Sequence, residues 1–99
     1  MITHVVLIQP KASTTIEDLS AFLEHVQALQ VKIPGILSIS AGENRSNFNG
    51  GYTHGIIMRF VDEDQLHAQH THPAHVALVT ELDRICQQSI DFDLPETAL

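Results

Sequence analysis

The chain has 99 residues and a formal net charge of −7, with 43% hydrophobic and 17% charged residues. This length accommodates one domain, residues 1–99, with one modest core, and the composition excludes a disordered chain. Five Lys and Arg against twelve Asp and Glu argue against nucleic acid or an anionic membrane as a partner. The lone Cys86 cannot form an internal disulfide, and neither a signal peptide nor a membrane-spanning apolar run is visible. We therefore expect a cytoplasmic protein.

The first elements are a strand and a helix. Residues 2–8 are nearly all apolar and β-branched, which is typical of a strand buried on both faces, with His4 as the polar exception. Thr14 and Glu17 have capping-box spacing, which predicts a helix of about 18 residues that ends at Pro34-Gly35. The predicted apolar stripe of this helix comprises Ile16, Leu19, Phe22, Leu23, Val26, Leu29 and Ile33.

Two strands and a loop follow. Residues 36–41 predict a short strand, in which Ile36, Ser38 and Ser40 alternate with Leu37, Ile39 and Ala41. Residues 44–51 are polar and glycine-rich and indicate a loop. Residues 52–61 predict a third strand, whose even-numbered face carries Tyr52, His54, Ile56, Met58 and Phe60.

The last third predicts an interrupted helix and a closing strand. Asp62 with Gln65 resembles a helix cap, and the helix should run to about Gln69, break before Pro73 and restart there. A strand is expected over residues 89–94, followed by a frayed tail. The apolar stripe of the restarted helix comprises Leu78, Val79, Leu82, Ile85 and Cys86.

The order is β-α-β-β-α-β, which predicts an α+β, ferredoxin-like domain. Two helices cover one face of such a sheet. Because the first and third strands look apolar on both faces, the other face also needs a cover. In so small a chain the simplest cover is the sheet of a second copy, so we expect a homodimer.

Three histidines surround Pro73 in the run His70-Thr71-His72-Pro73-Ala74-His75. His75 would be the third residue of the restarted helix and share its buried stripe. The positive end of the helix dipole disfavours an imidazolium there, so a neutral, proton-accepting ring is expected. A core histidine bonded to a backbone carbonyl is an equally good interpretation.

The remaining histidines have different expected roles. His72 is expected mainly to cap the helix, with ligand contact as the lesser alternative. His4 and His54 have apolar neighbours of the same strand parity and could converge on His75 as a polar cluster in an apolar pocket, or merely bridge backbone groups. His67 and His70 could bind an adventitious metal, but paired Cys or clustered carboxylates are absent. We expect neither a physiological metal site nor a cofactor.

Three segments resemble the stress-responsive A/B barrel domain family. They are Gly51-Tyr52-Thr53-His54, Arg59-Phe60 with the acidic turn after it, and His72-Pro73-Ala74-His75-Val76. His4 within an apolar strand and Pro34-Gly35-Ile36 before the second strand fit the same pattern. The resemblance covers nearly the whole chain and implies a dimeric α+β barrel built from two ferredoxin-like units.

The family contains plant stress-induced proteins and a plant polyketide cyclase. The resemblance to that cyclase implies that His75 is a general base, with His4 and His54 near the cavity. Gln69 stands where the cyclase has a tyrosine, and glutamine can hydrogen-bond a carbonyl but cannot transfer a proton as a phenol does. Some members hold a cation on carbonyls where the first helix ends, near Gln30, Ile33 and Ile36 here.

The sequence is therefore compatible with two functions. The first is the binding of a small carbonyl-bearing molecule in a cavity, with weak proton-transfer or cyclase-like chemistry on it. The catalytic candidates are His75, His54 and His4, and the candidate ligand contacts are His72, Gln69, Tyr52, Ile56 and Met58. The second is a non-enzymatic binding or assembly protein with structural or proton-sensing histidines. A cofactor-independent monooxygenase is a third option, which rests on fold analogy.

Overall fold

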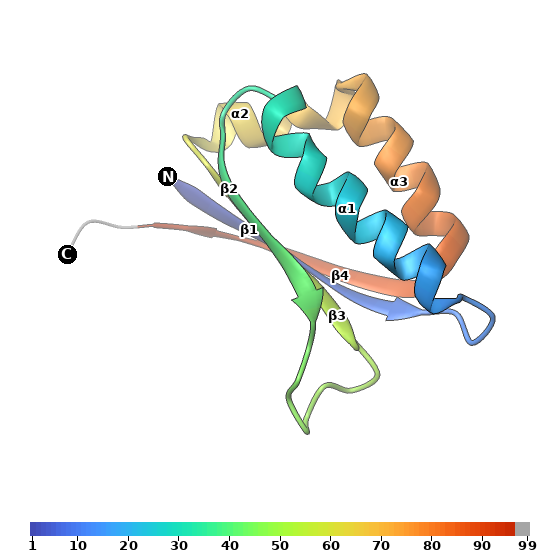
Figure 1. Ribbon diagram of the computed structural model, residues 1–99. Helices are drawn as coiled ribbons and strands as arrows, with labels where there is room; N and C mark the ends of the chain where they lie inside the picture. Colours follow the sequence, from blue (N-terminus) through green and yellow to red (C-terminus); the bar gives the residue numbers. More distant parts are fainter. Residues whose placement is uncertain (97–99) are drawn as a thin grey trace.

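The computed structural model describes residues 1–96, which form one antiparallel sheet with helices on one face (Figure 1). The strand order across the sheet is β2-β3-β1-β4. The ferredoxin-like order predicted from the sequence is confirmed. The elements are β1 (Ile2–Pro10), α1 (Ile16–Lys32), β2 (Ile36–Glu43), β3 (His54–Phe60), α2 (Glu63–Ala68), the 3₁₀ turn η1 (Gln69–Thr71), α3 (Pro73–Ile85) and β4 (Cys86–Pro95).

β1 lies inside the sheet, paired with β3 on one side and β4 on the other. Its alternation places Ile2, His4 and Ile8 against α1 and α3, where all three are buried. Thr3, Val5 and Leu7 point to the opposite, open face and are only half-buried. Figure 1 shows α1 and α3 side by side over one face, with no helix or strand of residues 1–96 over the other.

The open face carries a row of apolar side chains. Register pairs Val5 with Ile57 on one side and Phe92 on the other, so these three share the open face. Ile57 is 47% exposed and Phe92 50% exposed. Leu94, two residues after Phe92, has the same parity and is 58% exposed. The two-faced character predicted for the first and third strands is therefore present, and β4 extends it.

The start of α1 differs from the prediction by one residue. Thr15, not Thr14, is the N-cap: its hydroxyl accepts from the Asp18 backbone N–H, and the Asp18 carboxylate accepts from the Thr15 N–H. The Thr14 hydroxyl instead donates to the Ile85 carbonyl oxygen at 2.6 Å. This shift places Ile16 in the first turn facing solvent, so the expectation that Ile16 belongs to the buried stripe is wrong.

β2 also departs from simple alternation. A register shift between Ile36 and Ser38 puts Ile36 and Ile39 on the same buried face, opposite Phe60 and Met58. The alternation predicted for residues 36–41 is therefore wrong at its start, because a bulge inserts one extra residue. β3 begins at His54, so Tyr52 lies in the preceding loop.

The interrupted helix is confirmed, with its break as the 3₁₀ turn. Asp62 caps α2 by accepting from the Gln65 N–H, and Nδ1 of His72 caps α3 by accepting from the Ala74 N–H. Gly35, at φ +88°, lies so close to α2 that an added Cβ would be 2.7 Å from Cβ of Gln65. The turn after α1 thereby fixes where α2 and η1 sit.

Cys86 was expected in the apolar stripe of the last helix. It is buried, but as the first residue of β4, directly after α3. β4 is longer than predicted, and the tail beyond residue 96 lies outside the described residues. Within residues 1–96 we find no helix of the length and apolarity needed to cross a membrane.

The capping assignment gives a stability prediction. Thr15→Ala removes one half of the capping box and should lower the free energy of unfolding by about 1 kcal/mol. Urea denaturation measures this loss. Ser13→Ala, at an exposed position two residues earlier, is the matched control and should leave the midpoint unchanged. Equal midpoints for the wild type and Thr15→Ala would contradict the assignment.

Candidate functional site

A small pocket lies between the helix face of the sheet and α3. Its volume is about 50 Å³. Its walls are mostly apolar, and its polar residues are His4, Gln69 and His75. The apolar lining comprises Val6, Phe22, Ile56, Met58, Leu78, Val79 and Leu82. An apolar cavity with a few convergent polar groups is the usual composition of a small-molecule site.

His4 enters this pocket from β1. Its Nδ1 lies 2.5 Å from Oδ1 of Asp93, the residue paired with it on β4. A carboxylate only accepts hydrogen bonds, so Nδ1 donates and Nε2 is the free acceptor of the neutral ring. The ring also meets Phe60 in a T-shaped contact at a centroid distance of 6.5 Å. Asp93 and Phe60 together fix the tautomer and orientation of His4.

His75 enters from the first turn of α3, across from the sheet. Burial is the largest cause that lowers the pKa of His75 below its ordinary value of 6.5, and nearby His70, His4 and His72 lower it further. A hydrogen bond with the His70 backbone acts in the opposite direction and orients the ring. The His70 ring packs edge-on against it at a centroid distance of 5.4 Å. The pKa of His75 therefore lies below 6.5, and its main cause is burial, whereas the sequence prediction rested on the helix dipole.

Gln69 is the third polar side chain of the pocket, and it is 1% exposed. Within residues 1–96, neither its Nε2 nor its Oε1 has a hydrogen-bond partner. An unpaired buried amide costs about 1–3 kcal/mol per group, so native proteins rarely retain one without a reason. Both atoms are therefore available to a ligand.

This arrangement suits proton transfer on a small neutral molecule. An imidazole can accept or return a proton, and a buried amide can donate to a carbonyl oxygen and accept from an N–H or O–H. The lining residues include no Lys or Arg, so nothing in the wall favours an anion.

The comparisons with known proteins agree with this architecture. The sequence matches the stress responsive A/B barrel domain, Dabb, over residues 2–96. The chain belongs to the Dabb family. A search of curated proteins finds no match to this chain.

Several solved structures resemble the Dabb chain. A protein of Arabidopsis thaliana superimposes with a TM-score of 0.91 at 23% identity, covering 100% of this chain and 98% of that one. A dimeric ferredoxin-like protein from Jannaschia gives 0.85 at 22% identity, covering 96% and 98%. The hydroxynitrile lyase of Passiflora edulis gives 0.89 at 14% identity, covering 99% and 95%. At these identities the likenesses show the shared fold.

The Dabb fold brings together only some of the predicted site residues. His4, Gln69, His75, Ile56 and Met58 line the pocket. His54 does not: it pairs with Ile8, four residues along β3 from Met58, and its Nδ1 lies 2.9 Å from the Thr53 hydroxyl. Four residues of strand span about 13 Å. The predicted convergence of His54 with His4 and His75 is therefore corrected, because equal parity sets the face and not the position along it.

Tyr52 and His72 also lie outside the pocket lining. The Tyr52 hydroxyl donates to Oε1 of Gln88, at the β2–β3 loop end of the sheet. Gly51 before it, at φ +90°, turns the chain so close to Gln9 that an added Cβ would be 2.8 Å from Nε2. This motif therefore shapes the loop. His72 has the capping role that the sequence favoured.

Within residues 1–96, the other histidines and the Cys86 thiol do not form a second metal or catalytic site. His67 and His70 are neighbours at a ring-centroid distance of 6.2 Å, but no group of three or more His, Cys, Asp or Glu within residues 1–96 is arranged to hold a metal. Nε2 of Gln30, at the end of α1, donates to the Leu37 carbonyl oxygen. Burial raises the pKa of the Cys86 thiol to about 11, which keeps it un-ionised.

Sequence reasoning missed Asp93. It is 89 positions from His4 along the chain, and only the β1–β4 register brings them together. The alternation of Ile90, Phe92 and Leu94 with Asp91 and Asp93 carried a partial signal, since it put the acids on the helix face.

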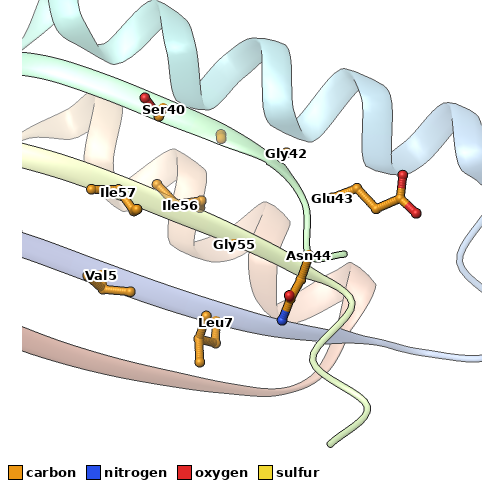
Figure 2. A pocket seen from close by; sticks show the side chains of 10 residues that line it. Val5, Leu7, Ser40, Gly42, Glu43, Asn44, Gly55, Ile56 and Ile57 are labelled. Carbon is orange, nitrogen blue, oxygen red and sulfur yellow. The ribbon is translucent and has the colours of Figure 1, made fainter. Parts of the chain in front are cut away.

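A second hollow lies on the open face, near the loop end of β2 and β3 (Figure 2). Its volume is about 340 Å³, and Val5, Leu7 and Ile57 project into it. Gly42 and Gly55, paired across β2 and β3, leave its floor without side chains. Its lining combines apolar side chains with Ser40, Glu43 and Asn44 and includes no imidazole, so it suits packing better than acid–base chemistry.

The lowered pKa of His75 predicts how stability depends on pH. As the pH falls through 6.5, His75 of the unfolded chain binds a proton, whereas His75 of the folded chain, with its lower pKa, stays unprotonated. The free energy of unfolding should therefore fall as the pH drops from 6.5 toward the folded pKa. Urea denaturation between about pH 7.5 and about pH 5, at one protein concentration, measures the slope.

His75→Gln should flatten this slope. An NMR titration of the His75 ring should place its pKa below 6.5. An unchanged slope in the variant, or titration above 6.5, would contradict the assignment of a neutral His75.

Proposed function

We propose that this Dabb protein is a homodimer that binds a small carbonyl-bearing molecule in the pocket between sheet and α3, and that His75 and His4 transfer a proton on it. The observation that carries the proposal is the set of three buried polar side chains, His4, Gln69 and His75, in one otherwise apolar pocket. The single thiol, Cys86, suits the reducing cytoplasm, which we propose as the location.

The two histidines have different supports and therefore different roles. His75, neutral through burial, is the general base that removes a proton next to the carbonyl. His4 is held by Asp93 and so keeps a fixed Nε2 acceptor, which orients the ligand or receives the proton. Gln69 Nε2 donates to the carbonyl oxygen as charge develops there. The shared fold with a hydroxynitrile lyase supports an enzyme of this architecture by analogy.

The homodimer rests on the open face. Ile57, Phe92 and Leu94 form a half-exposed apolar surface with Val5 and Leu7, on a sheet whose other face is already covered. A contiguous apolar patch of this kind is typical of an interaction site. The dimeric protein from Jannaschia, with the same fold, supports a second copy as its cover.

Proton transfer can be tested without knowing the natural substrate. Butan-2-one in D₂O exchanges its α-protons slowly, and NMR follows that exchange. The wild type should accelerate it, and His75→Gln should lose about 10²-fold or more of the acceleration, since positioned bases contribute 10²–10⁴-fold.

His25→Gln is the matched control. His25 lies on α1 and pairs with Glu81 at 2.8 Å, away from the pocket. It should keep the wild-type rate. Full acceleration in His75→Gln would remove the general-base role.

The dimer has its own test. Phe92→Glu places a charge on the open face beside Val5, where a second copy would bury it, and should convert dimers to monomers. Sedimentation equilibrium measures the mass. Val31→Glu is the control, because Val31 is 90% exposed on α1 and its loss should leave the dimer intact. A monomeric wild type would overturn the homodimer.

The alternative is a binding or assembly protein without turnover. It is favoured by the capping role of His72 and by the size of the pocket, about 50 Å³. The exchange experiment separates the two: ligand binding at His4 and His75 without any acceleration by the wild type would establish the non-enzymatic reading.

A further inference from the structure

The side-chain amide of Gln69 also indicates which chemical class of ligand fits the pocket. Its side-chain amide is 1% exposed, and both Nε2 and Oε1 lack partners within residues 1–96. Exchanging the two atoms by a flip of the amide leaves both unpaired, so the finding does not depend on how they are assigned. Its backbone is satisfied: the N–H donates to Gln65 and His67 carbonyls, and its carbonyl accepts from His72. The unpaired groups are the NH₂ donor and the carbonyl oxygen acceptor of one amide, side by side.

The unpaired Nε2 and Oε1 of Gln69 determine which carbonyl compounds can satisfy both atoms. A ketone can accept from Nε2 but leaves Oε1 unpaired in an apolar wall. A carboxylate has only acceptors, so it would face Oε1 with a second oxygen, and no Lys or Arg lines the pocket to balance its charge. A carboxamide with an N–H syn to its carbonyl satisfies both atoms through two parallel hydrogen bonds.

We propose that the ligand of this pocket is a small neutral carboxamide, anchored by Gln69 through a paired N–H···O and O···H–N contact. The inference rests on the proposed function, since it specifies the carbonyl compound of the same pocket. The apolar walls from Val6, Ile56 and Leu78 take the hydrocarbon part of the ligand. Its body must be short, because the pocket measures about 50 Å³.

Three matched probes test the selection. Propanamide, butan-2-one and propanoate have the same number of heavy atoms and differ in the groups they present to Gln69. We expect propanamide to bind the wild type about tenfold or more tighter than butan-2-one, because only the amide pairs both atoms, and propanoate to bind weakest. NMR titration of the full-length, labelled protein follows the Gln69 side-chain NH₂ and the ring signals of His4 and His75.

Gln69→Met removes the amide at nearly constant shape. It should bind propanamide and butan-2-one equally, and it should be at least as stable as the wild type because it relieves an unpaired buried group. Gln69→Leu provides a second variant with the same expectation. Gln27→Met, the same substitution at an exposed position of α1, should keep the wild-type preference.

The experiment distinguishes failure of the carboxamide proposal from failure of the proposed function. Equal binding of amide and ketone by the wild type, or an amide preference that survives Gln69→Met, would overturn the carboxamide while leaving a carbonyl pocket. Contact of the Gln69 NH₂ with ordered water alone, unmoved by propanamide, would overturn it too. If none of the three probes shifts His4 or His75, the proposed function fails with it.

Discussion

The apolar character of both faces of β1 is the constraint on which the rest of the molecule depends. This strand has hydrogen-bonded neighbours on both edges and apolar residues on both faces. A strand of this kind requires a cover above and below the sheet. The chain has enough length for two long helices, which cover one face. The open face with Val5 and Leu7 is the unmet half of that requirement, and the homodimer we propose answers it.

The same strand determines where the chemistry can occur. His4 is the one polar residue in the buried parity of β1, so it must lie under the helices and needs a partner. Asp93 supplies it from the neighbouring strand, at the rim of the sheet. α3 then brings His75 over the same part of β1, because its first turn starts at Pro73 after the 3₁₀ turn. The pocket is thus a product of strand pairing and of one helix break.

Local sequence patterns predicted the elements, and long-range pairing decided the site. The helix break and the His72 cap follow from residues within one or two turns of each other, so spacing alone could predict them. The lowered pKa of His75 instead comes mainly from burial and partly from His4 on a distant strand. His54 was misplaced because parity says nothing about distance along a strand, and β2 was misread because a bulge breaks its period between Ile36 and Ser38. Thr15 replaced Thr14 as the cap since a long-range bond to Ile85 holds Thr14.

Gln69 shows most clearly what the sequence leaves undetermined. Residue type alone would place a glutamine just before a helix break at the surface, where water would satisfy its amide, and only the family resemblance placed Gln69 among the ligand contacts. It is instead buried, because the close approach of Gly35 to Gln65 positions α2, which packs against β1 and β3, and Gln69 follows directly at the start of η1. Packing of the backbone therefore forces a polar side chain into an apolar pocket, at a cost to folding. This cost is most easily tolerated where a ligand forms the missing hydrogen bonds. The chemical class of the proposed ligand can therefore be inferred from the amide rather than from the histidines. The imidazoles already have Asp93 and the His70 backbone as partners; the amide is the group whose hydrogen bonds are still to be made.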